Sequence, residues 1–312
     1  MGLDPAIAAR VAHLWDAHVL QLLSGEVEGV PAAAPMVVDG VARTDDVVPG
    51  PGGSIPVRWY RSTDLADDEL APTLVWAHGG GWQYGDLDMP EADSVAQRVA
   101  AGLPGVVVSV DYRLAPAHRH PAALEDVLAV QRWVVEHGAD HGVDPHRVAL
   151  GGASAGGHLA ATAALAVAGE AEAPAALWLA YPVTDPDGGP YDGRHPDCPP
   201  VLWLDHLGTT KLFAGYLGDD PAGADPRIIP ARGDLSVLPP TLVTTAECDS
   251  LCPQARHFVG LAEAAGAAVE HHHVEGVLHG YLNVVGEEPI ADAALDRHID
   301  WLRSQLRAHS GA

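Results

Sequence analysis

The sequence predicts an α/β fold in which helices cover both faces of a mainly parallel β-sheet. Two observations support this class. Short strand-like runs alternate along the chain with longer helix-like segments, which is typical of βαβ units. The composition is that of a globular protein, with 47% hydrophobic and 19% charged residues. A chain of 312 residues can form one large domain with added segments, or two domains.

The chain starts with a predicted helix and a connection. Residues 4–24 are expected to be helical because Asp4 can cap the first turn, Pro5 suits it, and apolar residues recur at helical spacing. Residues 31–53 are rich in Pro, Gly and Ala and are expected to form a connection. Strands are then predicted at Ile55–Tyr60, Thr73–Ala77, Val106–Val110, Val148–Leu150, Leu177–Ala180, Thr241–Thr245 and Val269–Val274. Helices are predicted at residues 90–101, 121–138, 155–169, 253–266 and 290–307.

Residues 183–235 interrupt this alternation. They contain many prolines, glycines and aspartates around an apolar segment, Val201–Leu217. Because an insertion of this length between two strands is usually functional, we expect a lid over a pocket.

The composition excludes several classes of function. Asp and Glu total 42 against 17 Lys and Arg, a formal net charge of −25, and such a surface repels nucleic-acid phosphates. Lys211 is the only lysine, which excludes most mechanisms that need a lysine nucleophile or phosphate ligand. No apolar run reaches 18 residues, so no membrane span is expected. The first residues also lack a secretory signal, and we expect a cytoplasmic protein.

The three cysteines give no sign of a disulfide scaffold. Cys198, Cys248 and Cys252 cannot all pair within the chain. The spacing of Cys248 and Cys252 is compatible with a redox or zinc pair, but two ordinary thiols near a helix start are the expectation.

A candidate nucleophile lies in residues 152–156, Gly-Ala-Ser-Ala-Gly, between the strand Val148–Leu150 and an apolar helix. On such a tight strand-to-helix turn the hydroxyl of Ser154 would be exposed, and the glycines would avoid clashes with neighbouring backbone. The helix N-terminus would favour negative charge developing there. In a chain with 34 glycines, a simple glycine-rich connection is an equally good interpretation of this motif alone.

Residues 78–82, His-Gly-Gly-Gly-Trp, follow the strand Thr73–Ala77. Three glycines let backbone amides approach a substrate oxygen, as in the oxyanion hole of lipases and esterases. A flexible loop is the alternative, but the two motifs support each other. Trp82 is a candidate for the wall of the site.

An acid and a base are then needed, in the order Ser, Asp or Glu, His. Asp249 and His279 each follow a predicted strand, where open α/β sheets bind ligands. Glu247 is the competing acid and ranks second. Asp249 could also be a plain helix cap.

No metal site is expected among the 18 histidines. His271, His272 and His273 lie on one predicted strand, where alternate side chains point to opposite faces and cannot converge on one ion. His137 and His141 are four residues apart but lack the His-Glu-x-x-His pattern.

Five motifs in order resemble the hormone-sensitive-lipase-like esterases of the α/β-hydrolase superfamily. They are residues 78–82, 111–116 (Asp-Tyr-Arg-Leu-Ala-Pro), 152–157, 247–251 and 279–281. The resemblance implies an α/β-hydrolase fold, with a mostly parallel eight-stranded sheet flanked by helices and a helical cap. The cap would comprise residues 1–45 and 183–235, and the catalytic domain residues 46–312.

The resemblance also implies roles. Ser154 would be the nucleophile, His279 the base and Asp249 the acid. Backbone amides would donate to the oxyanion, those of Gly80, Gly81 and Ala155. Short- to medium-chain carboxylic esters would be the substrates, without any cofactor, and a homodimer would form through the edge strand at residues 269–274.

Two departures and two alternatives stay open. The family usually has an acidic residue where this chain has Ala153, and Glu where it has Ala117. Amide, lactone or acetyl-group hydrolysis would use the same residues. A non-catalytic ligand receptor would have lost the histidine, so His279 argues against it.

Apolar residues of the insertion either line an acyl pocket or only pack the cap on the sheet, among them Trp203, Leu207 and Phe213.

Overall fold

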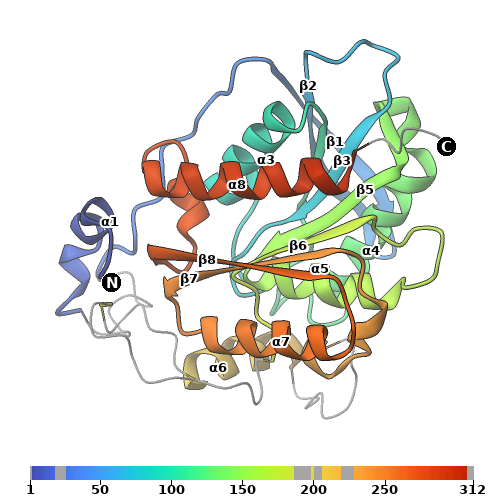
Figure 1. The fold of residues 1–312 in the computed structure, drawn as a ribbon. Helices are drawn as coiled ribbons and strands as arrows, with labels where there is room; N and C mark the ends of the chain where they lie inside the picture. Colours follow the sequence, from blue (N-terminus) through green and yellow to red (C-terminus); the bar gives the residue numbers. More distant parts are fainter. Residues whose placement is uncertain (1, 18–25, 186–197, 200–205, 219–227, 308–312) are drawn as a thin grey trace.

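A computed structural model describes residues 2–17, 26–185, 198–199, 206–218 and 228–307 (Figure 1). An eight-stranded sheet in the order β1-β2-β4-β3-β5-β6-β7-β8 forms its centre. β2 pairs antiparallel with β1 and β4, and all other neighbours are parallel. The strands are β1 (Val41–Gly50), β2 (Gly53–Ser62), β3 (Ala71–Ala77), β4 (Val106–Val110), β5 (Val143–Ala153), β6 (Ala176–Ala180), β7 (Thr241–Cys248) and β8 (Val269–Leu278). Every predicted strand is confirmed.

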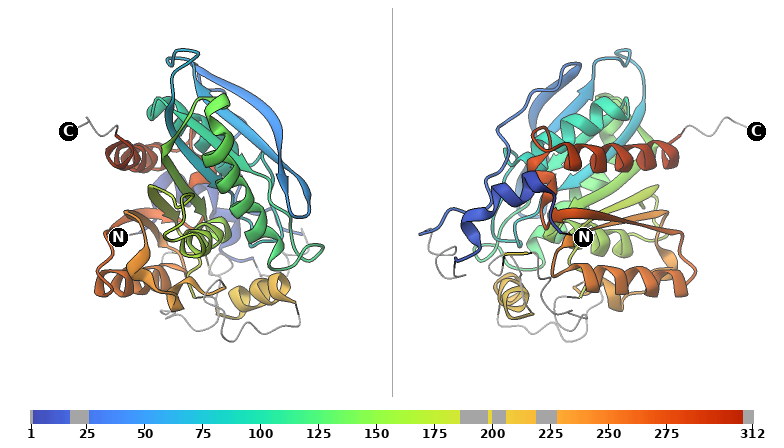
Figure 2. Two further views of the ribbon diagram at one scale, coloured as in Figure 1. Left: turned by 90° about the vertical axis from the view of Figure 1, so that its right-hand side faces the viewer. Right: turned by 60° about the vertical axis from the view of Figure 1, so that its left-hand side comes forward.

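Helices cover both faces of this sheet, and each face has its own apolar core (Figures 1 and 2). α3 and α8 lie on one face, and α4, α5 and α7 on the other. The α-helices are α1 (Pro5–Arg10), α3 (Pro90–Gly102), α4 (Ala122–His137), α5 (Ala155–Ala166), α6 (His206–Leu217), α7 (Cys252–Ala264) and α8 (Pro289–Gln305). Short 3₁₀ turns are η1 (Ala12–Leu14), η2 (Gly138–His141), η4 (Pro230–Arg232), η5 (Leu235–Val237) and η6 (Tyr281–Val284).

The N-terminal segment differs from the prediction in two places. The helix expected at residues 4–24 ends at Arg10, because Val11 leaves helical geometry (φ −103°, ψ 6°) and caps α1. The expected connection at residues 31–53 contains β1, which pairs with β2 along its whole length. β1 exposes nearly all of its residues apart from Val48, so it lacks the apolar alternation that reveals a strand. The segment outside the sheet therefore ends before Val41.

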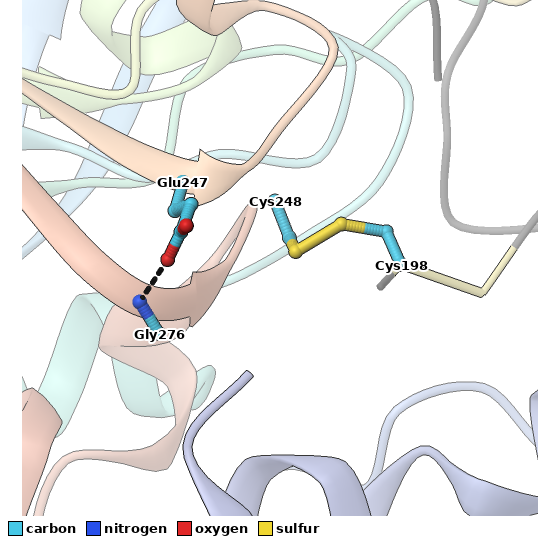
Figure 3. Close-up of a disulfide and its surroundings, with 4 residues drawn as sticks. All are labelled: Cys198, Glu247, Cys248 and Gly276. Carbon is cyan, nitrogen blue, oxygen red and sulfur yellow. Dashed lines mark hydrogen bonds between the residues drawn. A yellow bond between two sulfur atoms is a disulfide. The ribbon is translucent and has the colours of Figure 1, made fainter. Parts of the chain in front are cut away.

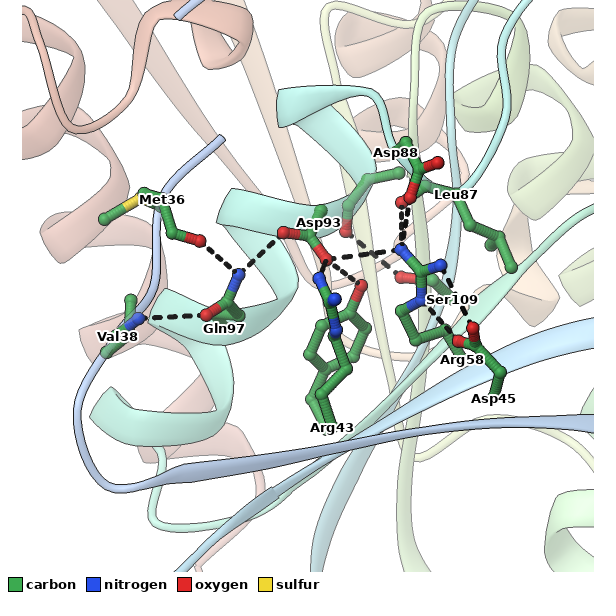
Figure 4. Close-up of polar contacts among 12 residues, drawn as sticks. Met36, Val38, Arg43, Asp45, Arg58, Leu87, Asp88, Asp93, Gln97 and Ser109 are labelled. Atoms are coloured by element: carbon green, nitrogen blue, oxygen red, sulfur yellow. Dashed lines mark hydrogen bonds and ion pairs between the residues drawn. The ribbon is translucent and has the colours of Figure 1, made fainter. Parts of the chain in front are cut away.

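A buried polar network ties this segment to the sheet and to α3 (Figure 4). Asp93 accepts hydrogen bonds from Tyr60 and Gln97, both at 2.7 Å, and pairs with Arg58. Gln97 in turn accepts the Val38 amide hydrogen. Asp93 thus accepts from β2 and from α3 itself, and Gln97 extends the network to the linker before β1.

Candidate active site

Ser154 lies on a sharp turn between β5 and α5. Its backbone is in a left-handed region rare for a residue with a side chain, at φ 53° and ψ −115°. A Cβ on Gly152 would lie 2.4 Å from backbone atoms of Gly156, and one on Gly156 would lie 2.1 Å from the Ala77 carbonyl oxygen. Only glycine at both positions lets β5, β3 and α5 approach closely enough to form this turn.

Three distant segments meet at this hydroxyl. The Ser154 hydroxyl lies 3.0 Å from Nε2 of His279, and Nδ1 of His279 lies 2.8 Å from Oδ2 of Asp249. Because the Asp249 carboxylate can only accept, Nδ1 carries the proton and donates, and Nε2 accepts from the serine. Asp249 also accepts the Leu251 amide hydrogen at 2.8 Å, so the residue shapes the turn before α7 as well.

Glu247 does not make this contact. Its carboxylate accepts the Gly276 amide hydrogen at 2.7 Å, from the adjacent strand β8 (Figure 3). The structure therefore brings Asp249, the first-ranked acid, to His279, and uses Glu247 to join β7 to β8.

The charges around His279 favour its protonated form. Burial lowers the pKa of His279, but the carboxylates of Asp249 and Glu91 together raise it further, so that the pKa lies above its ordinary value of 6.5. The imidazole is therefore a stronger base than a free histidine.

The glycine loop after β3 passes beside the nucleophile. Gly80, Gly81 and Trp82 all have positive φ, at 110°, 60° and 63°. A Cβ on Gly80 would lie 2.0 Å from the Tyr84 carbonyl oxygen, so this tight turn requires glycine. Gly80 and Gly81 line the same cavity as Ser154, whereas Ala155 is the buried first residue of α5.

Buried side chains hold the start of this loop. His78 stacks on Tyr112, and the Tyr112 hydroxyl donates to the His78 carbonyl at 2.8 Å. The imidazole Nδ1 of His78 lies 2.7 Å from the Gly79 carbonyl oxygen. Burial lowers the pKa of His78, which keeps the ring neutral. The backbone before Gly80 is thus constrained on both sides.

A cavity of about 440 Å³ opens over Ser154 and His279. Its floor comes from the loops after β3, β5 and β8. Its wall includes Ile7 and Arg10 of α1, residues 30–32, and Leu212 of α6. Both segments predicted as a cap therefore reach the cavity.

The predicted wall residues divide into three groups. Trp82 lines the cavity as predicted. Phe213 packs against Trp82, with ring centroids 5.6 Å apart, and its neighbour Leu212 faces the cavity instead. Trp203 and the side chain of Leu207 lie outside the described residues.

The prediction that Cys248 and Cys252 are two ordinary thiols was wrong for Cys248. Cys198 and Cys248 form a disulfide (Figure 3), and Cys252 is buried and not part of a disulfide. Since the partners are 50 residues apart, no local spacing reveals the bond. The disulfide attaches the 183–235 insertion to the end of β7, one residue before Asp249. It also removes the cysteine argument against an oxidising compartment, and a cytoplasmic location stays a prediction.

The three strand histidines point to two faces, as expected. His271 and His273 both contact the Thr245 hydroxyl, at 2.8 and 3.0 Å, while His272 stacks on His298 of α8. Within the described ranges no three His, Cys, Asp or Glu side chains are grouped so as to hold a metal ion. No helix among the described residues is long and apolar enough to cross a membrane.

A family model for the alpha/beta hydrolase fold matches residues 74–283. The chain belongs to this family. It is 36% identical to "Esterase LipI" of Mycobacterium tuberculosis, over 84% of this chain and 82% of LipI. It is 37% identical to "Carboxylesterase NlhH" of the same organism, over 81% of this chain and 79% of NlhH.

The fold is also similar to that of a solved esterase structure. "Pyrobaculum calidifontis esterase monoclinic form" matches with a TM-score of 0.80 and 30% identity, over 98% of this chain and all of that one (100%). The resemblance predicted from the five motifs and the predicted fold class are both confirmed.

Three features near the site were not predicted from the sequence. They are the Cys198–Cys248 disulfide, Arg10 in the cavity wall, and Glu91 beside His279. Arg10 is held by Glu287 and Glu288, which follow η6 nearly 280 residues later. Glu91 is buried and lines the cavity. None of these belongs to a sequence motif that could have indicated it.

Proposed function

We propose that this protein is a serine carboxylesterase that hydrolyses short- to medium-chain carboxylic esters through an acyl-enzyme. The observation that carries the proposal is the continuous hydrogen-bonded series from Asp249 through His279 to Ser154, on the floor of the 440 Å³ cavity. Relatives named esterase and carboxylesterase support the same reaction class.

In the first half of the reaction, Ser154 Oγ attacks the ester carbonyl while His279 Nε2 takes its proton. Amides of Gly80, Gly81 and Ala155 would donate to the oxyanion, each contributing roughly 10²–10³ in rate. Asp249 holds the imidazole tautomer and stabilises its cation. The alcohol leaves with the proton returned by His279.

In the second half, His279 takes a proton from a water molecule that attacks the acyl carbon. The bond to Ser154 Oγ then breaks, His279 returns the proton to Oγ, and the carboxylic acid leaves. The residues named need no cofactor for these steps. Leu212 and Trp82 supply apolar surface beside the glycine loop, which suits an acyl chain of a few carbons in a cavity of this size.

The wall is proposed to act as a cap, formed by the residues before β1 and by residues 183–235. Residues 41–45, which were predicted to belong to the cap, are part of β1. A homodimer through β8 is proposed as well, since this strand lies at one edge of the sheet and pairs on its outer side with no other described strand. Sedimentation velocity would test the dimer, and a monomer at all concentrations would contradict it.

Ser154→Ala tests the reaction itself. We expect hydrolysis of p-nitrophenyl esters to fall at least about 10³-fold, because the nucleophile is lost, while circular dichroism shows an intact fold. A fluorophosphonate should label the wild type and not this variant. Ser94→Ala, at a buried serine of α3, is the matched control and should keep activity and labelling. An active Ser154→Ala would contradict the proposal, and a panel including amides and lactones would separate the related reactions.

A further inference from the structure

Glu91 is a buried carboxylate next to the reacting groups that the proposed mechanism does not use. It is the second residue of α3, is only 2% exposed and lines the cavity. Its Oε1 accepts the Gly79 amide hydrogen at 2.6 Å. Its Oε2 accepts the Tyr181 hydroxyl at 2.5 Å and the Asn283 amide at 3.2 Å.

The three donors belong to different parts of the site. Gly79 directly precedes the glycines proposed to bind the oxyanion. The ring of Tyr181 packs edge-on against the imidazole of His279, with centroids 5.0 Å apart. Asn283 also donates to the Gly280 carbonyl at 3.2 Å, in the residue after His279. The Glu91 carboxylate thus links the glycine loop to Tyr181, which packs against the His279 ring. Through Asn283 it also links this loop to the residue after His279.

Several features favour the charged form of Glu91. Three donors point at its oxygens, and it lies in the first turn of a 13-residue helix, where the helix dipole stabilises an anion. Burial acts in the opposite direction and has the larger effect, so the pKa of Glu91 lies above its ordinary value. Both oxygens of Glu91 nevertheless accept hydrogen bonds in this arrangement, which is the pattern of a carboxylate.

We infer that Glu91 is a positioning residue of the hydrolase: by holding the Gly79 amide, the Tyr181 hydroxyl and Asn283 together, it fixes the oxyanion amides relative to the imidazole of His279. The inference rests on the proposed function. Glu91 has no role as nucleophile, acid or base, because Asp249 already occupies Nδ1 and Ser154 occupies Nε2 of the imidazole.

The charge of Glu91 also acts on the proton that His279 carries. The titratable groups around His279 are Asp249 after β7, Glu91 of α3 and Tyr181 after β6. When Ser154 transfers its proton, an imidazolium forms, and both carboxylates stabilise it. In the wild type, kcat/KM should therefore rise with pH through an apparent pKa above 6.5.

The test is Glu91→Gln. A neutral amide offers one oxygen to three donors, so at least one hydrogen bond is lost together with the charge. We expect kcat to fall about 10- to 100-fold, since removing one oxyanion donor costs roughly 10²–10³ and here the donors are misplaced rather than absent. KM should change less than about threefold, and the acidic limb of the pH profile should move to lower pH.

Asp93→Asn is the matched control. Asp93 lies two residues further along α3, is also buried, and accepts from Tyr60 and Gln97 on the side away from the cavity. This variant should lower the melting temperature while kcat and the pH profile of the folded fraction stay unchanged. Should Glu91 be merely structural, Glu91→Gln would behave in the same way, and the inference would be overturned.

Two further variants show whether a negative result refutes the role of Glu91 or the proposed function itself. If Ser154→Ala is inactive while Glu91→Gln keeps wild-type kcat and pH profile, only the role of Glu91 is refuted. If Ser154→Ala is active, the proposed function is refuted, and the inference about Glu91 loses its basis. Should Glu91→Gln not fold, Tyr181→Phe removes one donor and keeps the ring on His279. It should lower kcat severalfold with the same direction of pH shift, and an unchanged Tyr181→Phe would also overturn the inference.

Discussion

The floor and the wall of the cavity are built differently. Each segment of the floor follows a strand of the central sheet, and its polar groups are paired with neighbouring backbone or buried side chains. The wall consists of α1, residues 30–32 and α6, which lie outside the sheet (Figure 2). Under the proposed function, the floor would carry the chemistry and the wall would contact the acyl or alcohol group of the substrate.

Ion pairs, a ring stack and a disulfide are among the contacts that attach the wall to the rest of the molecule. Arg10 pairs with Glu287 and Glu288. On α6, Tyr216 stacks on Trp82 with ring centroids 5.2 Å apart, and its hydroxyl contacts the imidazole of His120 at 3.1 Å. The Cys198–Cys248 disulfide is a third attachment. A substitution in the wall can affect the position of floor residues through these contacts.

The largest effect is expected in the floor. Asp249→Asn keeps the shape of the acid but favours the wrong tautomer of His279, so kcat should fall about 10⁴-fold on every ester. Steady-state kinetics on acetate, butyrate and octanoate esters would measure this. Glu247→Gln is the control, because its amide oxygen can still accept from Gly276, and it should stay within about threefold of wild type. Equal losses in both variants would contradict the assignment of Asp249.

A smaller and selective effect is expected in the wall. Leu212 approaches the glycine loop so closely that a Cβ on Gly81 would lie 3.3 Å from it. Leu212→Trp should therefore fill space above the loop and lower kcat/KM for octanoate relative to acetate by about tenfold or more, a typical cost for a poorly fitting apolar group. Leu217→Trp, on the same helix and away from the cavity lining, is the control. An equal loss of kcat/KM for esters of all chain lengths would contradict the different roles of floor and wall.

The smallest effect on turnover is expected where floor and wall are joined. Cys198→Ser opens a covalent loop of 50 residues, which should lower the free energy of unfolding by about 2–4 kcal/mol. Turnover of a small acetate ester should change less than about threefold, because Asp249 keeps its hydrogen bonds to Leu251 and His279. Urea unfolding and kinetics with and without a reductant measure both quantities. A large loss of turnover would mean that the bond itself positions the acid.

The parts that were predictable from the sequence have local causes. The turn at Ser154 and the loop at Gly80 depend on glycines within a few residues, next to apolar strands, so their sequence patterns indicate their geometry. The Cys198–Cys248 bond and the three donors around Glu91 depend on residues brought together by the whole fold, and no spacing indicates them. β1 was missed for a third reason: its stability comes from pairing with β2 rather than from burial of its own side chains.

The position of the single lysine has a practical consequence. Lys211 is exposed on α6, next to Leu212 in the cavity wall. Apart from the α-amino group, an aldehyde resin or an amine-reactive dye can attach to the chain only there. Covalent immobilisation would therefore fasten the enzyme by a helix that lines the cavity, while an environment-sensitive fluorophore at the same amine should report on ester binding.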